Sequence, residues 1–419
     1  MPVSDDRPTP PFLHPFARPA ATEFIEIVRG EGALIWDADG NEYVDALASL
    51  WYCNVGHGRA ELADAVGEQL RTLDAFHTFE LFTNPAAERL TAELAALAPM
   101  PDARVFLTNS GSESVDTAMK LARLFWSWQG RADRSVIISR DRAYHGVTYG
   151  GTSAQGLAPN KEHWGDLLGG VVQVHAESLD EVAAALAQHG DRVAAVITEP
   201  VQGAGGVFPP ADGYLQGLRE LCDGNGALLV FDEVITGFGR LGTWWGADRY
   251  GVTPDLITFA KGVTSGYQPL GGVLVGPRVR EVLESDDTRW LRHGFTYSGH
   301  PAACAAASAN LAVLRDDDLL ARAPHIGAVL QPGLQAIVDD GLASGVRGTD
   351  GIWALAMHAD TSAMDVRDRM LRNGVIPRPI ATHSVAFCPP LVITDEQLDR
   401  TLSVTRDALE AVRARASTT

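Results

Sequence analysis

The stretch PDLITFAKGVTSGY, residues 254–267, places a lysine between an apolar run and a glycine. Lys261 is one of only three lysines among the 34 basic residues of the chain, the others being Lys120 and Lys161. Arginine therefore supplies nearly all of the positive charge. A lysine kept in a semi-buried position indicates that an amine is needed, because a guanidinium cannot lose its proton or form an imine. Lys161, in a polar loop, and Lys120, on the polar side of a helix, are interpreted as ordinary solvated lysines; a solvated strand end remains the alternative for Lys261.

The apolar run before Lys261 belongs to a pattern that recurs from about Val105 to Val275. Short apolar runs end at a polar residue before a turn, in RVFLTNSGSES, SVIISRDRAYHG, VAAVITEPVQG, ALLVFDEVITG, DLITFAKG and LGGVLVG. Helical periodicity lies between several of them, in residues 112–126 and 179–189. Unalternating strands separated by helices predict an α/β fold with a mostly parallel sheet, buried on both faces. Ligands collect at the carboxyl ends of such strands, which here carry Asn109, Arg140, Glu199, Asp232 and Lys261.

The rest of the chain predicts a second, smaller unit formed from both termini. Residues 17–50 contain GALIWDADGNEYVDAL, two alternating runs about a DADGN turn, which is typical of a hairpin. After about residue 320 an α+β module follows, with a helix near 362–373 and a terminal helix from about 394. We expect residues 1–55 and 321–419 to form this smaller domain, and residues 56–320 to form the large one.

Composition and charge limit the function classes. The 419 residues carry a net charge of −19 and have a pI near 5.0, which argues against nucleic acid or an anionic membrane as partner. The four cysteines show no CxxC spacing, so neither a disulfide frame nor a zinc site is expected. The N-terminus does not resemble a signal peptide, and no apolar run reaches 18 residues. We expect a soluble, cytoplasmic protein.

Two strand ends carry candidate ligand-binding groups. Asp232 ends a buried strand, where an isolated charge costs several kcal/mol; it is either a structural ion-pair partner or a partner for a cationic heterocycle. Ser110, Gly111 and Ser112 lie where a strand passes into a helix, so their backbone N–H groups and the helix dipole favour an anion. A plain N-cap is the alternative for this serine-rich turn. The turn lacks the Walker pattern, and GAGGV (residues 203–207) lacks the spacing of a dinucleotide fingerprint.

The motif RAYHG adds an aromatic side chain to these candidates. Tyr144 is placed to stack on a planar ligand, although plain packing explains it as well. His145 has no serine, cysteine or second histidine at a useful spacing, so no metal site is expected. An anion cradle, a stacking aromatic, a buried aspartate and a primary amine together suit pyridoxal phosphate, which has a phosphate, a flat ring, a pyridinium nitrogen and an aldehyde. Lys261 would then hold the aldehyde as an imine.

Six motifs carry a resemblance to a known family. They are TNSGSESVDTAMKLAR, AYHG, EPVQGAGGV, FDEVITGFGRLG, PDLITFAKGVTSGY and HGFTYSGHP. The chain resembles class III pyridoxal-phosphate aminotransferases of fold type I, most closely the ω-amine:pyruvate transaminases, from about residue 12 to the terminal helix. The resemblance implies a homodimer, or a tetramer of two dimers, with shared active sites.

The resemblance also implies roles for single residues around the cofactor. Lys261 matches the Schiff-base lysine that also moves the proton, and Asp232 the aspartate that pairs with the pyridinium nitrogen. Tyr144 matches the residue stacked over the ring and Val234 the one packed under it. Further matches are the phosphate loop with Gly111 and Ser112, Glu199 near the ring hydroxyl, and Thr296, which reaches the phosphate from the neighbouring subunit; Ser110 and His145 complete the cofactor-binding set.

Substrate-binding residues follow from the same resemblance. Phe16, Trp51, Phe79 and Phe82 correspond to aromatic pocket walls, together with Tyr144. Arg378 matches a mobile arginine that swings in for a keto-acid carboxylate and out for an apolar amine. Ala204 stands where relatives that prefer 4-aminobutyrate or ornithine usually carry a glutamate, which favours pyruvate over 2-oxoglutarate. The segment 156–182 is shorter than in several amine transaminases, which leaves any pocket wall there undefined.

The predicted reaction moves an amino group from a primary amine or ω-amino acid to pyruvate, in a ping-pong cycle that gives a ketone or aldehyde and alanine. A 2-oxoglutarate transaminase of the 4-aminobutyrate, ornithine or diaminopelargonate type is one alternative. A decarboxylase, aminomutase or racemase on the same scaffold would share Lys261 and Asp232. A catalytically silent protein of this fold is the remaining alternative.

Overall fold

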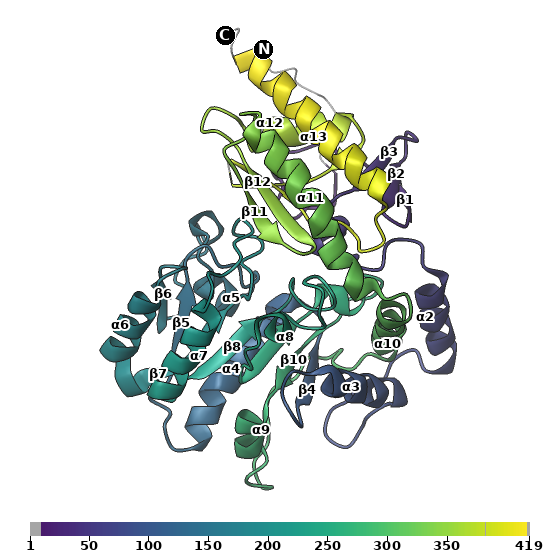
Figure 1. The fold of residues 1–419 in the computed structure, drawn as a ribbon. Helices are drawn as coiled ribbons and strands as arrows, with labels where there is room; N and C mark the ends of the chain where they lie inside the picture. The colour runs from purple at the N-terminus through teal and green to yellow at the C-terminus, as the bar shows by residue number, and fades with distance from the viewer. Residues whose placement is uncertain (1–9, 382, 417–419) are drawn as a thin grey trace.

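A computed structural model describes residues 10–381 and 383–416 of the chain. Its large lobe is built on a seven-stranded sheet in the order β4-β10-β9-β8-β7-β5-β6 (Figure 1). The strands are β4 (Arg104–Thr108), β5 (Val136–Arg140), β6 (Val171–Val174), β7 (Val193–Thr198), β8 (Leu228–Asp232), β9 (Leu256–Phe259) and β10 (Gly271–Val275). β10 runs antiparallel to both of its neighbours, whereas β5 to β9 pair in parallel. The predicted mostly parallel α/β sheet is confirmed.

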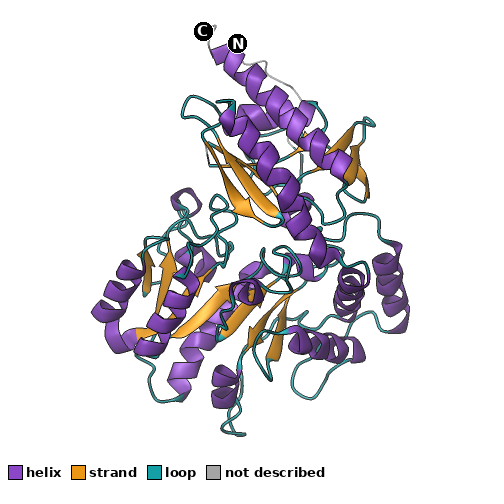
Figure 2. Ribbon diagram, in the orientation of Figure 1, coloured by secondary structure: helices purple, strands orange, loops and turns teal. Residues whose placement is uncertain are grey.

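Alternate residues of these strands pack into two separate apolar cores, as the two-residue period of a strand requires. Ala195 and Ile197 of β7 pack with Val115 and other residues of α4 (Gly111–Trp128). Val196 packs on the opposite face, with residues of α6 (Leu179–His189) and α7 (Tyr214–Asn225). The sheet is therefore buried on both faces, and the helices that flank it are visible in Figure 2.

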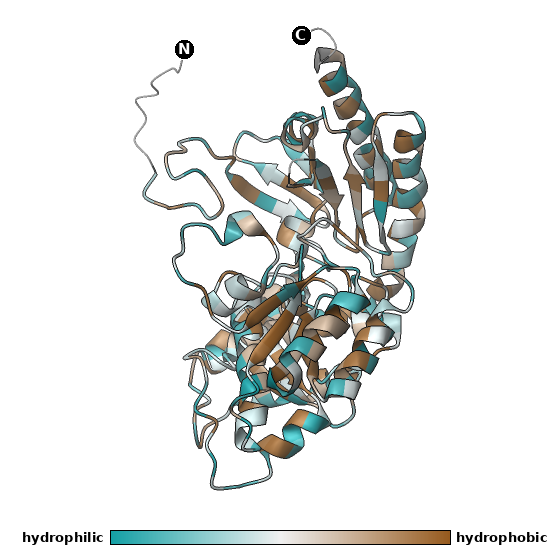
Figure 3. Cartoon of the chain, turned by 90° about the vertical axis from the view of Figure 1, so that its left-hand side faces the viewer, coloured by the Kyte–Doolittle hydropathy of each residue, from teal (hydrophilic) through white to brown (hydrophobic). Residues whose placement is uncertain are grey.

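The smaller lobe joins segments from both ends of the chain. Its first sheet has the order β1-β2-β3-β13, and its second has the order β11-β12-β15-β14. These strands are β1 (Ile27–Glu31), β2 (Leu34–Asp37), β3 (Glu42–Asp45), β11 (Gly345–Thr349), β12 (Ile352–Ala356), β13 (Val375–Ile376), β14 (Arg378–Ile380) and β15 (Ser384–Phe387). Parallel pairing of β13 with β3 brings the two ends together, as the predicted discontinuous unit requires; its boundaries stay a prediction. Figure 3 shows the two lobes one above the other.

The predicted hairpin is confirmed, and its turn has a local cause. The side chain of Asp37 accepts hydrogen bonds from the backbone N–H groups of Asp39 (3.1 Å) and Asn41 (2.8 Å). An aspartate that bonds its own backbone in this way favours a turn over a continuing strand. Asp37 also accepts from the Tyr43 hydroxyl at 2.7 Å, which fixes β3 against the turn.

Several further helices complete the two lobes. They are α1 (Ala48–Trp51), α2 (Ala60–Thr72), α3 (Pro85–Leu97), α5 (Tyr149–Ala154), α8 (Gly246–Tyr250), α9 (Pro277–Leu283), α10 (Pro301–Asp316), α11 (Arg322–Asp339), α12 (Ala363–Arg372) and α13 (Asp395–Ala416), with short 3-10 turns at Ala158–Asn160, Gly190–Arg192, Lys261–Val263 and Leu319–Ala321. Across residues 10–381 and 383–416, no helix is long and apolar enough to cross a membrane. The four cysteines are free and buried.

Candidate active site

Asp232 is the last residue of β8 and is only 4% exposed. Its Oδ2 lies 2.7 Å from His145 Nδ1, and its Oδ1 accepts from the Thr258 hydroxyl (3.1 Å) and the Val234 N–H (3.2 Å). Because the carboxylate can only accept, Nδ1 is the protonated nitrogen of the His145 ring. The other ring nitrogen, Nε2, is buried and has no hydrogen-bond partner in the described part of the protein. The aspartate is thus fixed and desolvated.

Lys261 begins the 3-10 turn two residues after the end of β9, the strand that pairs with the Asp232 strand, β8. Its backbone takes a φ of +46°, a conformation that residues other than glycine rarely adopt. Burial lowers the pKa of the Lys261 amine, and the carboxylates of Asp232 and Glu199 act in the opposite direction. The sequence therefore places the amine, as predicted, in a partly buried position where it can lose its proton more readily than a solvated lysine.

Glu199 and Tyr144 lie in the same group of residues as Asp232 and Lys261. Glu199 follows β7 and is buried; its Oε1 accepts from the backbone N–H of Tyr144 (3.0 Å) and its Oε2 from that of Gly203 (2.9 Å). Burial raises the pKa of the Glu199 carboxyl, and Asp232 raises it further. Burial also raises the pKa of the Tyr144 hydroxyl, with contributions from Asp232 and, in the opposite sense, Arg378. The bond from the Tyr144 N–H to Glu199, and that of the next residue, His145, to Asp232, bring Tyr144 together with both carboxylates.

The predicted phosphate loop forms the N-terminus of α4. Ser110 is the N-cap and accepts from the Glu113 N–H at 3.2 Å. Gly111 has no room for a side chain, since an added Cβ would lie 2.9 Å from Cγ1 of Val234. Ser112 Oγ accepts from the Val147 N–H (3.0 Å), and at Gly146 (φ +93°) a Cβ would lie 2.6 Å from the same oxygen. Both glycines therefore permit close packing around the helix terminus. Val234 lies beside Gly111, and its place under the cofactor ring stays a prediction.

Arg378 and Trp51 come from the smaller lobe and the N-terminal region. Arg378 begins β14, and burial lowers the pKa of its guanidinium, while Tyr144 raises it. It also contributes to the pKa of Lys261, so its charge is felt at the amine. Trp51 is buried and packs in one apolar cluster with Ile380 of β14. Trp51 has a φ of +68°, a strained conformation of the kind that functional sites retain.

Four predicted site residues lie on the surface of the chain. Thr296, Phe79 and Phe82 are exposed. Phe79 and Thr296 belong to segments that pack on each other, since Thr78 Oγ1 donates to the Ser298 carbonyl at 2.8 Å. Phe16 is 73% exposed and has a φ of +53°. A single chain thus brings Lys261, Asp232, Glu199 and Tyr144 together, whereas Phe16, Phe79, Phe82 and Thr296 lie on its exposed surface. The roles assigned to these four exposed residues stay predictions.

Two of the strand-end residues, Arg140 and Asn109, have structural roles. Arg140, the last residue of β5, donates to the carbonyls of Ala176 (3.0 Å) and Glu199 (2.6 Å), which joins it to the loops after β6 and β7. Asn109 donates its backbone and side-chain N–H groups to Glu113.

Thr258, whose hydroxyl donates to Asp232, was not predicted from the sequence. Its signal is a hydroxyl in an otherwise apolar strand three residues before Lys261, which a search for polar atoms inside buried strands would have found.

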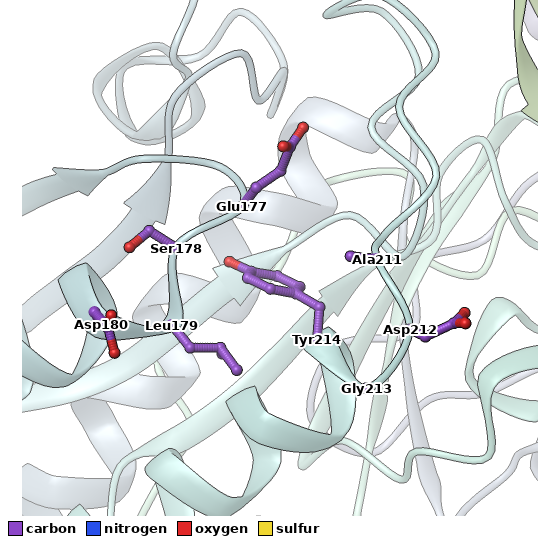
Figure 4. A pocket seen from close by; sticks show the side chains of 8 residues that line it. All are labelled: Glu177, Ser178, Leu179, Asp180, Ala211, Asp212, Gly213 and Tyr214. Carbon is purple, nitrogen blue, oxygen red and sulfur yellow. The ribbon is translucent and has the colours of Figure 1, made fainter.

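A pocket of about 400 Å³ lies apart from this cluster, between the N-terminal ends of α6 and α7 (Figure 4). It is lined by Glu177, Ser178, Leu179, Asp180, Ala211, Asp212, Gly213 and Tyr214. Three carboxylates would repel a phosphate or a keto acid, while two helix N-termini and the guanidinium of Arg140, 5.2 Å from the Tyr214 ring, disfavour a cation. The pocket contains none of the predicted site residues.

The residues of the cluster fit pyridoxal phosphate. The glycine-lined helix terminus leaves backbone N–H groups free for a phosphate, the buried Asp232 suits a protonated ring nitrogen, and Lys261 supplies the amine. The orphaned Nε2 of His145 is the kind of buried polar atom that a polar ligand would satisfy. No cluster of three potential metal ligands occurs within residues 10–381 and 383–416.

Comparison with known proteins gives consistent similarities. The chain matches the family described as "Aminotransferase class-III" over residues 16–409. It is 35% identical to putrescine–pyruvate aminotransferase of Pseudomonas aeruginosa, over 93% of this chain and 91% of that protein. It is also 35% identical to diaminobutyrate–2-oxoglutarate transaminase of Halomonas elongata, over 92% and 90%. A PLP-bound amine transaminase from an uncultivated Pseudomonas species has a TM-score of 0.93 and 35% identity, covering 97% of this chain and 99% of the other.

Proposed function

This chain belongs to the class-III aminotransferases, which depend on pyridoxal phosphate, and on that premise we propose that it transfers an amino group from a primary amine or ω-amino acid to pyruvate. The observation that carries the proposal is the position of Arg378. Its half-buried guanidinium begins β14, and its charge acts on both Tyr144 and the Lys261 amine. A guanidinium binds a carboxylate through two parallel hydrogen bonds, so Arg378 can hold the carboxylate of a keto acid beside the reacting amine.

The residues of the cluster divide the chemistry between them. Bound pyridoxal phosphate supplies an electron-accepting ring that stabilises negative charge on the substrate carbon. Ser110, Gly111 and Ser112 would hold its phosphate at the N-terminus of α4, and Asp232 would keep a proton on its ring nitrogen. Lys261 Nζ would take the proton from the carbon that bears the amino group and deliver it to the aldehyde carbon of the cofactor, which the lowered pKa of the amine favours at moderate pH. Donor and acceptor use the same site in turn, so the kinetics should be ping-pong.

Pyruvate is preferred over 2-oxoglutarate as the acceptor because of position 204. The resemblance places a glutamate there in relatives that prefer 4-aminobutyrate or ornithine, and this chain has Ala204. Similar relatives of both types exist, one named for pyruvate and one for 2-oxoglutarate. A 2-oxoglutarate transaminase is therefore the second candidate, and a decarboxylase or aminomutase is the third.

A homodimer with shared active sites is part of the proposal. Phe79, Leu81, Phe82, Trp290 and Tyr297 are all exposed. They lie on two segments joined by hydrogen bonds from Thr78 to the Ser298 carbonyl and from Asn84 to the Gly299 carbonyl (2.9 Å). We call this surface, residues 76–84 with 290–299, the aromatic face. Exposed apolar surfaces of this kind mark interaction sites, and a second copy could bring Thr296 to the phosphate loop.

Spectroscopy with two substrates tests the transfer. The purified protein with pyridoxal phosphate is titrated with 1-phenylethylamine and then with pyruvate, while its visible absorbance and the free alanine are measured. We expect the absorbance to fall with the amine and return with pyruvate, with one alanine formed per turnover. Glutamate formation with 2-oxoglutarate, and no alanine with pyruvate, would identify the second candidate; carbon dioxide release from an amino acid would identify the third.

A cytoplasmic location is also proposed. Its support is the state of the four cysteines, which are all free and buried, as expected in a reducing compartment. Localising the tagged protein in its own cells is the corresponding measurement.

A further inference from the structure

The segment from His293 to Ser298 is fastened at both ends and exposed in the middle. It belongs to the connection between α9 and α10, which descends to the bottom of the view and returns (Figure 1). Thr296 and Tyr297 are exposed, while His293 and Ser298 are partly buried. We refer to residues 293–298 as the strap. What fastens its ends decides where Thr296 is presented.

His293 is held by two side chains one helical turn apart on α4. Its Nε2 lies 2.9 Å from Thr117 Oγ1, and its Nδ1 lies 2.9 Å from Lys120 Nζ. A lysine ammonium can only donate, so Nδ1 must accept and Nε2–H must donate to the threonine. This pair of bonds requires a neutral imidazole in one tautomer. Lys120, interpreted from the sequence as an ordinary solvated lysine, is therefore a hydrogen-bond donor to a residue 173 positions away.

Aromatic packing fixes the plane of the same ring. His293 stacks on Phe106 of β4, with centroids 5.3 Å apart and planes within 5° of each other. Phe295 packs against its edge at 5.2 Å. Burial lowers the pKa of His293, Lys120 lowers it further, and Asp116 acts in the opposite sense. Packing and charge thus favour the neutral form that the two hydrogen bonds need.

The far end of the strap is fastened to β4. The Ser298 hydroxyl donates to the Leu107 carbonyl at 2.8 Å and accepts from the Phe295 N–H at 3.2 Å. β4 leads directly into the phosphate loop, and α4 begins with it. Both ends of the strap are therefore attached to the two elements that form the chain's own anion cradle.

We propose that Thr117 and Lys120, by holding neutral His293, position Thr296 for the phosphate group bound by a second copy of the chain. The inference rests on the proposed homodimer, because in one chain Thr296 is exposed. Thr117, Lys120 and His293 are then positioning residues that act in trans. In each chain, β4 and α4, which form the anion cradle of that chain, hold the strap, and its Thr296 contacts the phosphate in the other chain. Displacement of one strap then weakens cofactor binding in the opposite subunit.

The first test compares Thr117→Val with Thr117→Ser. Valine keeps the shape of the side chain and removes the acceptor, while serine keeps the hydroxyl. Loss of this one hydrogen bond should speed cofactor release from the holoenzyme about fivefold, and serine should leave the rate within about twofold of wild type. The melting temperature of the cofactor-free dimer is measured in parallel, because a merely structural role would lower it together with cofactor retention.

Lys120→Met gives an independent variant at the exposed end of the anchor. It removes the donor to Nδ1 without touching the threonine, and we expect release to accelerate about two- to fivefold, an effect shared with Thr117→Val and not additive with it. If the effects of the two substitutions on the release rate simply add in the double variant, Thr117 and Lys120 do not act through the same His293 ring, and the proposed anchoring is wrong.

A cis–trans experiment distinguishes an effect across the subunit interface from an effect within one chain. In differently tagged heterodimers, Lys261→Ala in one chain leaves the visible absorbance of lysine-linked cofactor only in the other. When Thr117→Val is in the same chain as Lys261→Ala, the remaining Lys261 site faces the weakened strap, and release should be fast. When Thr117→Val lies instead in the chain that retains Lys261, release should be close to wild type.

The outcomes distinguish failure of the inference from failure of the proposed function. If wild type makes alanine as a dimer but release is fast only when Thr117→Val and the intact Lys261 are in one chain, the effect is local and the trans inference is wrong. If wild type is monomeric at micromolar concentration with cofactor bound, the inference is also overturned, whatever the variants do. If no amine and keto acid react, the function fails while the strap can still be judged from cofactor release.

Discussion

The backbone of Lys261 shows how the site holds a reactive amine. A positive φ costs a non-glycine residue about 1–3 kcal/mol and persists only where the surroundings enforce it. Here it turns the chain two residues after the end of the buried strand β9, which pairs with the strand that ends at Asp232. A side chain without an ionisable amine at this position would keep the strained backbone but could neither form an imine nor transfer a proton.

Replacing Lys261 should therefore separate charge from proton transfer. Lys261→Arg keeps the positive charge but cannot act as a base, because a guanidinium stays protonated. We expect turnover to fall by at least about 10²–10⁴-fold, the usual contribution of a positioned base, and Lys261→Ala to be inactive. The measurement is alanine formation from pyruvate and amine. Lys161→Arg, at a lysine whose Nζ donates to the Ser153 carbonyl (3.2 Å), is the matched control and should keep its activity; full activity in either Lys261 variant would refute the assigned role.

Single residues also mark the limit of what the sequence could predict. The strand-end positions of Lys261, Asp232 and Glu199 were predictable because buried polar residues at strand ends stand out against apolar runs. The role of Lys120 was not, because helical periodicity places it on a polar face and its partner His293 lies far away in the chain. A contact between distant side chains leaves no local pattern.

At the level of elements, the connection from β8 to α8 depends on a buried carboxylate. Glu233 is fully buried, and its Oε1 accepts from the Ala247 N–H (2.8 Å). Its Oε2 accepts from the Thr236 hydroxyl at 3.0 Å and from the Gly246 N–H. The carboxylate thus closes the loop that contains Arg240, which donates to the carbonyls of Gly351 and Pro389 in the smaller lobe.

This carboxylate should make stability depend on pH in a defined window. Burial raises the pKa of Glu233 to about 7, from 4.5. Between these values the folded protein keeps a proton that the unfolded chain gives up, so this group's contribution falls as pH rises through the window and levels off above about pH 7. The difference is about 3 kcal/mol. We expect Glu233→Gln to lose this component, measured as the difference in urea unfolding free energy between variant and wild type at several pH values; parallel curves would contradict it.

The elements themselves were predicted unevenly, for physical reasons. α6 was expected at residues 179–189 and lies there, because its apolar spacing is regular and Ser178 caps it. β6 was missed, since VVQV is a short, partly exposed edge strand between polar segments. The antiparallel direction of β10 was not predicted, although the connection of residues 260–270 is too short for the crossover helix that a parallel strand requires.

At the level of the whole molecule, the predicted site residues fall into two groups, one in the interior cluster and one on the exposed surface. Lys261, Asp232 and Tyr144 meet in one cluster, whereas Thr296 and Phe82 are exposed. Sequence motifs name residues of a site without saying which copy of the chain contributes them, so this division could not be derived from spacing. The prediction that Thr296 serves a neighbour fits its exposure.

Leu81, which is 93% exposed on the aromatic face, gives a direct test of the assembly. In an isolated chain, Leu81→Asp should change stability by no more than about 0.5 kcal/mol, because the side chain already faces water. In a dimer that covers this face, the buried unpaired charge should cost several kcal/mol and shift the protein to monomers. We expect Leu81→Asp to sediment as a monomer at micromolar concentration and to lose transfer activity, although its Lys261 cluster is unchanged. Met364→Glu, at an exposed apolar residue of α12, is the control and should remain a dimer; a fully active, monomeric Leu81→Asp would mean that one chain forms the complete site by itself.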